Sequence, residues 1–249
     1  AKKVGINPKR ARLLNRLIRY LKIENVLELG TSLGISTAAM AIGNDVKITT
    51  VEGCPETAKV AQENFDAFNL NNIELKIGEF GVLLNDILEG RKKSEEKRDE
   101  NRKKRKENKE IPNPPAGRAG PESPINEQQT TTDQKSQNPN SKSHPEISGP
   151  NPQLTNPESR INKHQTFDLI FFDGNHKREA TLSYFEKLLP LAHNDSVFIF
   201  DDIHWSEGME EAWKEICAHP KVKVSIDTFQ WGLVFFRKEQ KKQHFVIRL

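Results

Sequence analysis

A carboxylate and an imidazole follow an apolar segment of the chain. The segment FDLIFF, residues 167–172, has the composition of a strand buried on both faces, and it is followed by Asp173 and His176 in the sequence Asp-Gly-Asn-His. A carboxylate and a neutral imidazole can both take up a proton, and histidine, with a pKa of about 6.5, does so near neutral pH. Asp-Gly-Asn-His is also an ordinary turn sequence. The pattern therefore predicts either a solvated turn or a site that moves a proton.

A second candidate site is the glycine-containing sequence LELGTSLGIST, residues 27–37. In a parallel sheet the first strand-to-helix turn is where a nucleotide binds, and glycine lets the backbone approach that ligand. The dinucleotide fingerprint would need two further glycines after Gly30, where the chain has Ser32 and Ile35. Glu52 ends the next strand-like segment, 22 residues after Gly30, where a carboxylate can accept hydrogen bonds from ribose hydroxyls. We expect a ligand without a pyrophosphate, with a loop glycine and a solvated glutamate as the alternative.

Alternating strand-like and helix-like segments of the sequence would position these candidate site residues. The first predicted helix opens at Asn7-Pro8, a favourable cap and first-turn pair. The alternation predicts an α/β fold: a mostly parallel, Rossmann-like sheet with helices on both faces. Residues 222–238 hold two strand-like runs joined by a short turn, which predicts an antiparallel C-terminal hairpin. The other predicted strands are residues 25–30, 46–53, 73–80, 167–173 and 196–202.

The chain changes composition between residues 91 and 165. No Phe, Trp or Tyr occurs there, and residues 111–165 hold ten of the fourteen prolines. Such a segment cannot bury enough apolar area to offset its ordering entropy. We predict one domain, residues 1–90 and 166–249, interrupted by a disordered insert, residues 91–165, whose charged first part is partly helical. The insert enters at the N-terminal end of a predicted strand, whereas ligands bind at C-terminal ends, so we expect no part for it in ligand binding.

The composition limits the classes of protein to which the chain can belong. The chain has 38 basic and 35 acidic residues, a formal net charge of +3, which by itself does not indicate a nucleic-acid partner. Two cysteines, Cys54 and Cys217, are too few for a disulfide framework and suit a reducing compartment. No apolar run approaches the roughly 18 residues of a membrane helix. We therefore expect a cytoplasmic protein without a membrane partner. The chain begins at Ala1 rather than Met, which leaves open whether an N-terminal segment precedes it.

The chain resembles the class I S-adenosylmethionine (SAM)-dependent methyltransferases. The sequences VLELGTSLG, TTVEG and LKIGEF are similar to the first three cofactor segments of that family, in the same order. The resemblance covers the chain outside the insert and is closest to the O-methyltransferase branch, which includes catechol O-methyltransferase and small-molecule relatives. It implies a seven-stranded sheet in which the C-terminal hairpin supplies one antiparallel strand.

The resemblance also implies roles in binding SAM. Glu28 and Gly30 would lie beside the methionine moiety, and Ser36 would help to hold its carboxylate. Glu52 would bind the ribose, and residues 78–81 would border the adenine. The predicted cofactor-binding residues are Glu28, Gly30, Thr31, Ser32, Gly34, Ser36, Glu52, Gly53, Gly78, Glu79, Phe80 and Asp173.

Metal-dependent members of the family end the fourth strand in aspartate and the fifth in Asp-Asp or Asp-Asn. Asp173, Asp201 and Asp202 match this pattern, which implies a Mg²⁺ site. The metal would neutralise three mutually repelling carboxylates and lower the pKa of an acceptor hydroxyl. Asp173 and His176 are the predicted catalytic residues, and His176 stands where catechol-type enzymes have a lysine base, which argues against a catechol acceptor. Metal-free methyl transfer and a fold without catalysis stay open.

We therefore expect a SAM-dependent O-methyltransferase that acts on a small hydroxylated molecule with Mg²⁺ assistance. A homodimer and a partner for the basic insert are left open. A nucleic-acid partner is not favoured, because the base-methylation-like motif NPPA, residues 113–116, lies in the insert and lacks its aromatic residue. The main alternative is a scaffold or interaction module that binds the cofactor without catalysis. An NAD-dependent oxidoreductase is a lesser one, since Ser32 and Ile35 interrupt its fingerprint.

Overall fold

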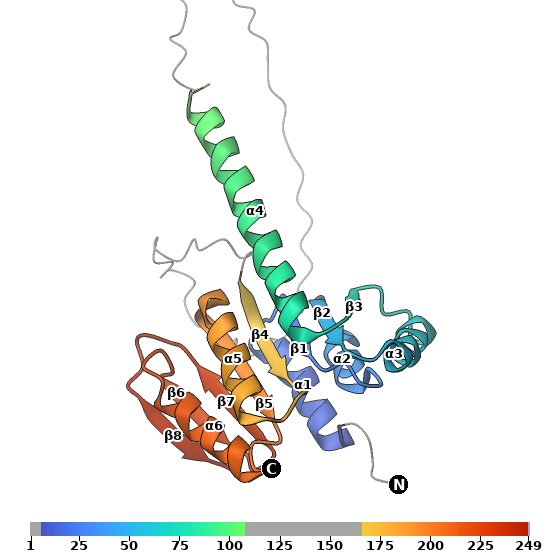
Figure 1. The fold of residues 1–249 in the computed structure, drawn as a ribbon, viewed down its shortest axis with the longest axis vertical. Helices are drawn as coiled ribbons and strands as arrows, with labels where there is room; N and C mark the ends of the chain where they lie inside the picture. Colours follow the sequence, from blue (N-terminus) through green and yellow to red (C-terminus); the bar gives the residue numbers. More distant parts are fainter. Residues whose placement is uncertain (1–5, 108–165, 249) are drawn as a thin grey trace, which may run out of the picture. The chain divides into compact units, whose positions relative to one another are not determined.

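The structure is a computed structural model that describes residues 6–107 and 166–248. It is built on one sheet with the strand order β3-β2-β1-β4-β5-β7-β6-β8 (Figure 1). The strands are β1 (Asn25–Leu29), β2 (Lys47–Glu52), β3 (Ile73–Ile77), β4 (Phe167–Phe172), β5 (Ala192–Asp201), β6 (Val224–Asp227), β7 (Trp231–Phe235) and β8 (Gln243–Val246).

The direction of the strands confirms the predicted α/β fold. Strands β1 to β5 pair in parallel, whereas β7 is antiparallel to both β5 and β6. All six residues of β4 are buried, as expected for a central parallel strand with helices on both faces. The carboxyl ends of β1, β2, β3, β4 and β5 therefore meet at one edge of the sheet, where a ligand site is expected.

The sheet has eight strands rather than the predicted seven. The additional strand, β8, pairs in parallel with β6, and the Oγ of Ser225 lies 2.8 Å from Nδ1 of His244 on β8. All four residues of β8 are exposed. The prediction missed this strand because an exposed edge strand need not carry the alternating apolar pattern that marks a half-buried one.

The helices cover both faces of the sheet (Figure 1). One buried cluster contains side chains of α4, α5 and α6, and a second contains side chains of α1 and α2, while α3 packs on β2 and β3. No helix among the described residues is long and apolar enough to cross a membrane. The helices are α1 (Pro8–Tyr20), α2 (Ile35–Ala41), α3 (Pro55–Ala67), α4 (Phe80–Glu107), α5 (Arg178–Leu188), the short 3₁₀ helix η2 (Leu189–Leu191) and α6 (Glu207–Ala218).

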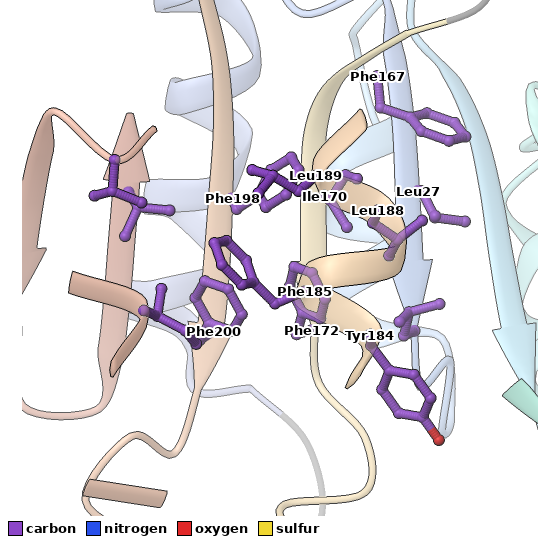
Figure 2. Close-up of a cluster of buried hydrophobic side chains, with 14 of the residues drawn as sticks. Leu27, Phe167, Ile170, Phe172, Tyr184, Phe185, Leu188, Leu189, Phe198 and Phe200 are labelled. Atoms are coloured by element: carbon purple, nitrogen blue, oxygen red, sulfur yellow. The ribbon is translucent and has the colours of Figure 1, made fainter. Parts of the chain in front are cut away.

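Stacked aromatic rings hold the middle of the sheet to α5. The rings of Phe172 on β4 and Phe200 on β5 are stacked with centroids 4.3 Å apart, and Phe185 of α5 meets Phe200 edge-on at 6.1 Å. Figure 2 shows these three rings together and the ring of Tyr184 at the margin of the cluster, with its hydroxyl pointing away. Packed aromatic side chains of this kind give β4 and β5 a fixed position below the site.

The first part of the predicted insert is helical rather than disordered. Helix α4 continues to Glu107, so it includes residues 91–107 of the charged segment, in line with the expected partial helicity. Its last residues, 99–107, group with a second unit, residues 99–159, and the rest of the described chain forms the first. The remainder of the predicted insert, residues 108–165, lies outside the described residues.

Candidate active site

A cavity of about 510 Å³ lies at the carboxyl ends of β1 to β4. Seven of the predicted cofactor-binding residues line it: Gly30, Ser32, Glu52, Gly53, Glu79, Phe80 and Asp173. Because these residues follow four different strands, the parallel sheet is what brings them together. We call this space the cofactor cavity.

Gly30 allows two strand ends to approach closely. Its φ is 105°, in the region that favours glycine, and a Cβ at this position would lie 2.5 Å from the backbone oxygen of Asp173. The next residue of β4's turn, Gly174, is equally confined, since its Cβ would meet the ring of Phe80 at 2.7 Å. The two glycines thus allow the turns after β1 and β4 and the ring of Phe80 to pack closely beside the cofactor cavity.

Glu52 is held in place by backbone groups. Its Oε2 accepts a hydrogen bond from the N–H of Ser32 at 2.8 Å, and its Oε1 accepts one from the N–H of Cys54 at 2.9 Å. Each carboxylate oxygen has a second acceptor position. The side chain is half-buried and lines the cofactor cavity, so it can accept hydrogen bonds from a ligand diol.

Glu28 and Ser36 do not reach the cofactor cavity. Glu28 is completely buried and accepts hydrogen bonds from the hydroxyls of Ser36 at 2.6 Å and Thr50 at 2.7 Å, and from Thr37. Burial raises the pKa of Glu28 above its ordinary value. Thr31 is also buried, with its Oγ1 2.6 Å from that of Thr50. These residues form a polar network beneath the turn, which supports the turn from inside the protein.

Two glycines that were predicted to bind the cofactor lie outside the cofactor cavity and are confined by neighbouring side chains. Gly34 caps the start of α2 with a φ of 75°, and a Cβ there would lie 2.5 Å from the ring of Phe65. Gly78 has a φ of 150° and packs against Leu83. Neither residue lines the cofactor cavity. Both glycines therefore shape the backbone near the site.

Four lining residues were missed by the sequence analysis: Thr57, Gly174, Asn175 and Tyr184. Gly174 and Asn175 belong to the Asp-Gly-Asn-His turn, so their position could have been inferred from that of Asp173. Tyr184 lies on α5, and its hydroxyl accepts a hydrogen bond from the Nδ2 of Asn175 at 3.2 Å. Nothing in the periodicity of α5 distinguishes a tyrosine at the cavity wall from one in the core.

Asp173 lies between the cofactor cavity and the end of β5. Burial and the neighbouring carboxyl group of Asp201 raise the pKa of Asp173 well above its ordinary value. Asp201 also pairs with Arg10 of α1, whose Nη1 lies 3.1 Å from Oδ1 of Asp201. The guanidinium of Arg10 thus offsets part of the carboxylate repulsion that the sequence predicted at this edge.

The arrangement of the three aspartates does not favour the predicted Mg²⁺ site. Among residues 6–107 and 166–248, no group of three His, Cys, Asp or Glu side chains is placed to hold a metal ion. Arg10 occupies one oxygen of Asp201, and Asp202 has a left-handed φ of 53°. A metal bound by Asp173, Asp201 and Asp202 would need these contacts to change, so the metal site stays a prediction that the described side chains do not support.

His176 lies in the loop between β4 and α5. Its side chain is partly exposed, does not line the cofactor cavity, and makes no hydrogen bond with another described residue. Because it does not line the cofactor cavity, His176 could contact a ligand there only if this loop moved. Its role as a base stays a prediction.

Comparison with known proteins decides the family. The profile of a family described as O-methyltransferase matches residues 1–97, and that of a family described as methyltransferase domain matches residues 126–203. A catechol O-methyltransferase of Niastella koreensis is 30% identical over 89 residues, which are 34% of this chain and 40% of that protein. The chain belongs to the class I SAM-dependent O-methyltransferase family. It matches less than half of the length of this curated relative.

Solved O-methyltransferase structures share the fold. An O-methyltransferase from Bacillus cereus in complex with SAH has a TM-score of 0.54 at 18% identity, over 94% of this chain and 83% of that one. The O-methyltransferase TomG from Streptomyces achromogenes, involved in tomaymycin synthesis and in complex with SAM, has a TM-score of 0.55 at 14% identity, over 94% and 82%. At such low identity these likenesses establish the O-methyltransferase fold alone.

Proposed function

We propose that this chain transfers the methyl group of SAM to a hydroxyl oxygen of a small molecule. The observation that supports this most is that the Gly30 turn, Glu52 and Asp173 line a single cavity at the carboxyl edge of the sheet. Glycine at Gly30 lets the turns after β1 and β4 approach each other at the cavity, and the anchored carboxylate of Glu52 suits the ribose of a nucleoside ligand. The residues present therefore fit SAM.

The reaction requires a nucleophilic oxygen and a place for its proton. Bound SAM supplies an electrophilic methyl group: the acceptor oxygen forms a bond to the methyl carbon as the carbon–sulfur bond breaks, giving a methyl ether and S-adenosylhomocysteine. Asp173, between the cofactor cavity and Asp201, lies where the acceptor hydroxyl would come. Its role would be to orient that hydroxyl, while His176 would take up the proton after a movement of its loop toward the cofactor cavity.

Mg²⁺ assistance, which the family resemblance implies, is a separate part of this proposal. The described side chains do not support it, because Arg10 already neutralises Asp201. We therefore derive no step through a metal. The same binding experiment tests the point when it is run with Mg²⁺ and again with EDTA.

Isothermal titration of SAM into the full chain tests the proposed function. We expect a dissociation constant on the order of micromolar. Glu52→Ala removes a charged acceptor of two hydrogen bonds and should weaken binding roughly 10- to 100-fold. Glu63→Ala, an exposed glutamate of α3, is the matched control and should bind SAM as the unaltered chain does.

Turnover separates the enzyme from the non-catalytic scaffold. With a panel of hydroxylated acceptors, S-adenosylhomocysteine should form together with the methylated product. SAM binding that depends on Glu52 but never leads to product would favour the scaffold. An absence of SAM binding by well-folded protein would refute the proposed function. The cytoplasmic location and the homodimer stay predictions that neither experiment addresses.

A further inference from the structure

A second cavity, of about 740 Å³, lies between α1 and the turn of residues 228–230 that joins β6 to β7. Among the residues that the structure describes, six cationic side chains and no acidic one line it. We call it the basic cavity. Its cationic residues are Lys9, Arg10, Arg12, Arg16, Arg19 and Arg248.

Most of this positive charge is not neutralised within the described chain. Helix α1 has five basic residues and no acidic one in the sequence PKRARLLNRLIRY. Among the residues that the structure describes, Lys9, Arg12 and Arg16 form no ion pair with a carboxylate. A concave surface lined by charges of one sign raises the local concentration of oppositely charged ligands.

Arg10 joins the basic cavity to a carboxylate near the cofactor cavity. Arg10 lines it, lies over the ring of Trp231 at 5.6 Å and pairs with Asp201. Asp201 in turn neighbours Asp173, which lines the cofactor cavity. Three charged side chains, Arg10, Asp201 and Asp173, therefore connect the wall of the basic cavity with that of the cofactor cavity.

We propose that the basic cavity binds the anionic group, a carboxylate or a phosphate, of the methyl acceptor. This inference rests on the proposed function, because it assigns the acceptor of that reaction. Arginine in the cavity would make charge-assisted hydrogen bonds to the anion and so place the hydroxyl of the same molecule near Asp173. The exposed ring of Phe229 in the turn gives the cavity an apolar wall for the body of the acceptor.

A small acidic molecule suits this cavity better than a nucleic acid. Its volume lies in the range of about 300 to 1,000 Å³ that is usual for small-molecule sites. Proteins that bind single strands combine an extended basic groove with several aromatic stacking platforms. Here the basic residues converge on one cavity, and Phe229 is the one aromatic side chain among the described residues of its wall.

Titration with three probes tests the proposal and distinguishes the two kinds of anion. 3,4-Dihydroxybenzoate carries a carboxylate, inorganic pyrophosphate carries phosphates, and catechol is the neutral counterpart of the first probe. We expect at least one anionic probe to bind roughly tenfold or more tightly than catechol, and its affinity to fall as salt is added. The probe that binds identifies the acidic group.

Charge reversal at Arg16 locates the binding. Arg16→Glu should weaken the anionic probe by roughly five- to tenfold while SAM affinity and the melting temperature are retained. Lys214→Glu, on the exposed side of α6, is the matched control and should leave both affinities unchanged. Arg12→Glu provides a second variant in case the first fails to fold.

The outcomes separate this inference from the function on which it rests. SAM binding without any anion binding would refute the basic cavity alone. Anion binding without SAM binding would refute the proposed function and with it the acceptor assignment. A single-stranded RNA oligomer that binds more tightly than either small anion and competes with it would also overturn the assignment to an acidic acceptor.

Discussion

Gly30 lies so close to the backbone of Asp173 that a side chain at this position would clash with it. An added Cβ would lie 2.5 Å from that carbonyl oxygen, and the φ of 105° disfavours other residues. We expect Gly30→Ala to lower the free energy of unfolding by about 2 kcal/mol and to weaken SAM binding roughly tenfold or more, because the two turns must separate. Chemical denaturation and titration measure the two effects. In the control variant Gly90→Ala, the new Cβ of this helical residue meets no heavy atom within 4 Å. This variant should not lower the free energy of unfolding.

Arg10 supplies the positive charge that pairs with the carboxylate of Asp201. Both side chains of this ion pair are mostly buried, with exposed fractions of 17% and 15%. Removing one partner leaves the other charge without compensation, so Arg10→Ala should lower the free energy of unfolding by about 2–3 kcal/mol. We also expect this variant to bind Mn²⁺ more tightly than the unaltered chain does, as measured by electron paramagnetic resonance. Arg10→Ala with Asp201→Asn should lose the added Mn²⁺ binding; equal Mn²⁺ binding in all three proteins would contradict the assigned role of Arg10.

At the scale of elements, one carboxylate ties the start of β4 to the start of β1. Asp168 accepts hydrogen bonds from the backbone N–H groups of Glu24 and Asn25, both at 2.8 Å, and lies 2.9 Å from Nε2 of His193. Burial by itself would raise the pKa of Asp168, but these hydrogen bonds lower it below its ordinary value. The parallel pairing of β1 and β4 is therefore supported by a charge at the edge opposite the site.

This lowered pKa predicts a dependence of stability on pH. Because the folded-state pKa lies below the unfolded value of about 3.9, the contribution of Asp168 is complete above that value and is lost as the pH falls through the folded-state pKa. The melting temperature of Asp168→Asn should be lower than that of the unaltered chain at about pH 7, and the difference should shrink toward about pH 3. Asp195→Asn, at an exposed ion pair, should show little difference at either pH. A gap for Asp168→Asn that stays constant with pH would count against this account.

At the scale of the whole molecule, the part of α4 beyond residue 90 is not needed by the core. Phe80, Leu83, Leu84 and Ile87 pack against the buried cluster, whereas every described side chain from residue 93 to 105 is exposed. We expect that replacing residues 91–165 by a flexible linker of about 15 Gly and Ser residues leaves SAM affinity and turnover within a few-fold. Titration and product formation measure this, and a large loss in a folded protein would show that the replaced segment takes part in function.

Much of the architecture follows from local patterns. The apolar strands predicted the parallel sheet, and Gly30, Glu52 and Asp173 were placed at its carboxyl edge because ligand sites in such sheets lie there. The eighth strand was missed, since its four exposed residues carry no burial signal. Glu28 and Ser36 were expected to contact SAM, but the structure places them in a buried hydrogen-bond network. From the sequence alone, a buried carboxylate and one that binds a ligand look the same.

What the sequence by itself determined about this protein is the order of its strands and helices and the residues that end each strand, because hydrophobic period and turn residues are local properties. The tertiary structure alone decided which side chains meet. Arg10 and Asp201 are 191 positions apart, yet their contact sets the charge beside Asp173 and joins it to a residue that lines the basic cavity. Such contacts depend on how α1 packs across the ends of distant strands, and the free energy of that packing is shared among many residues, so no local pattern records it.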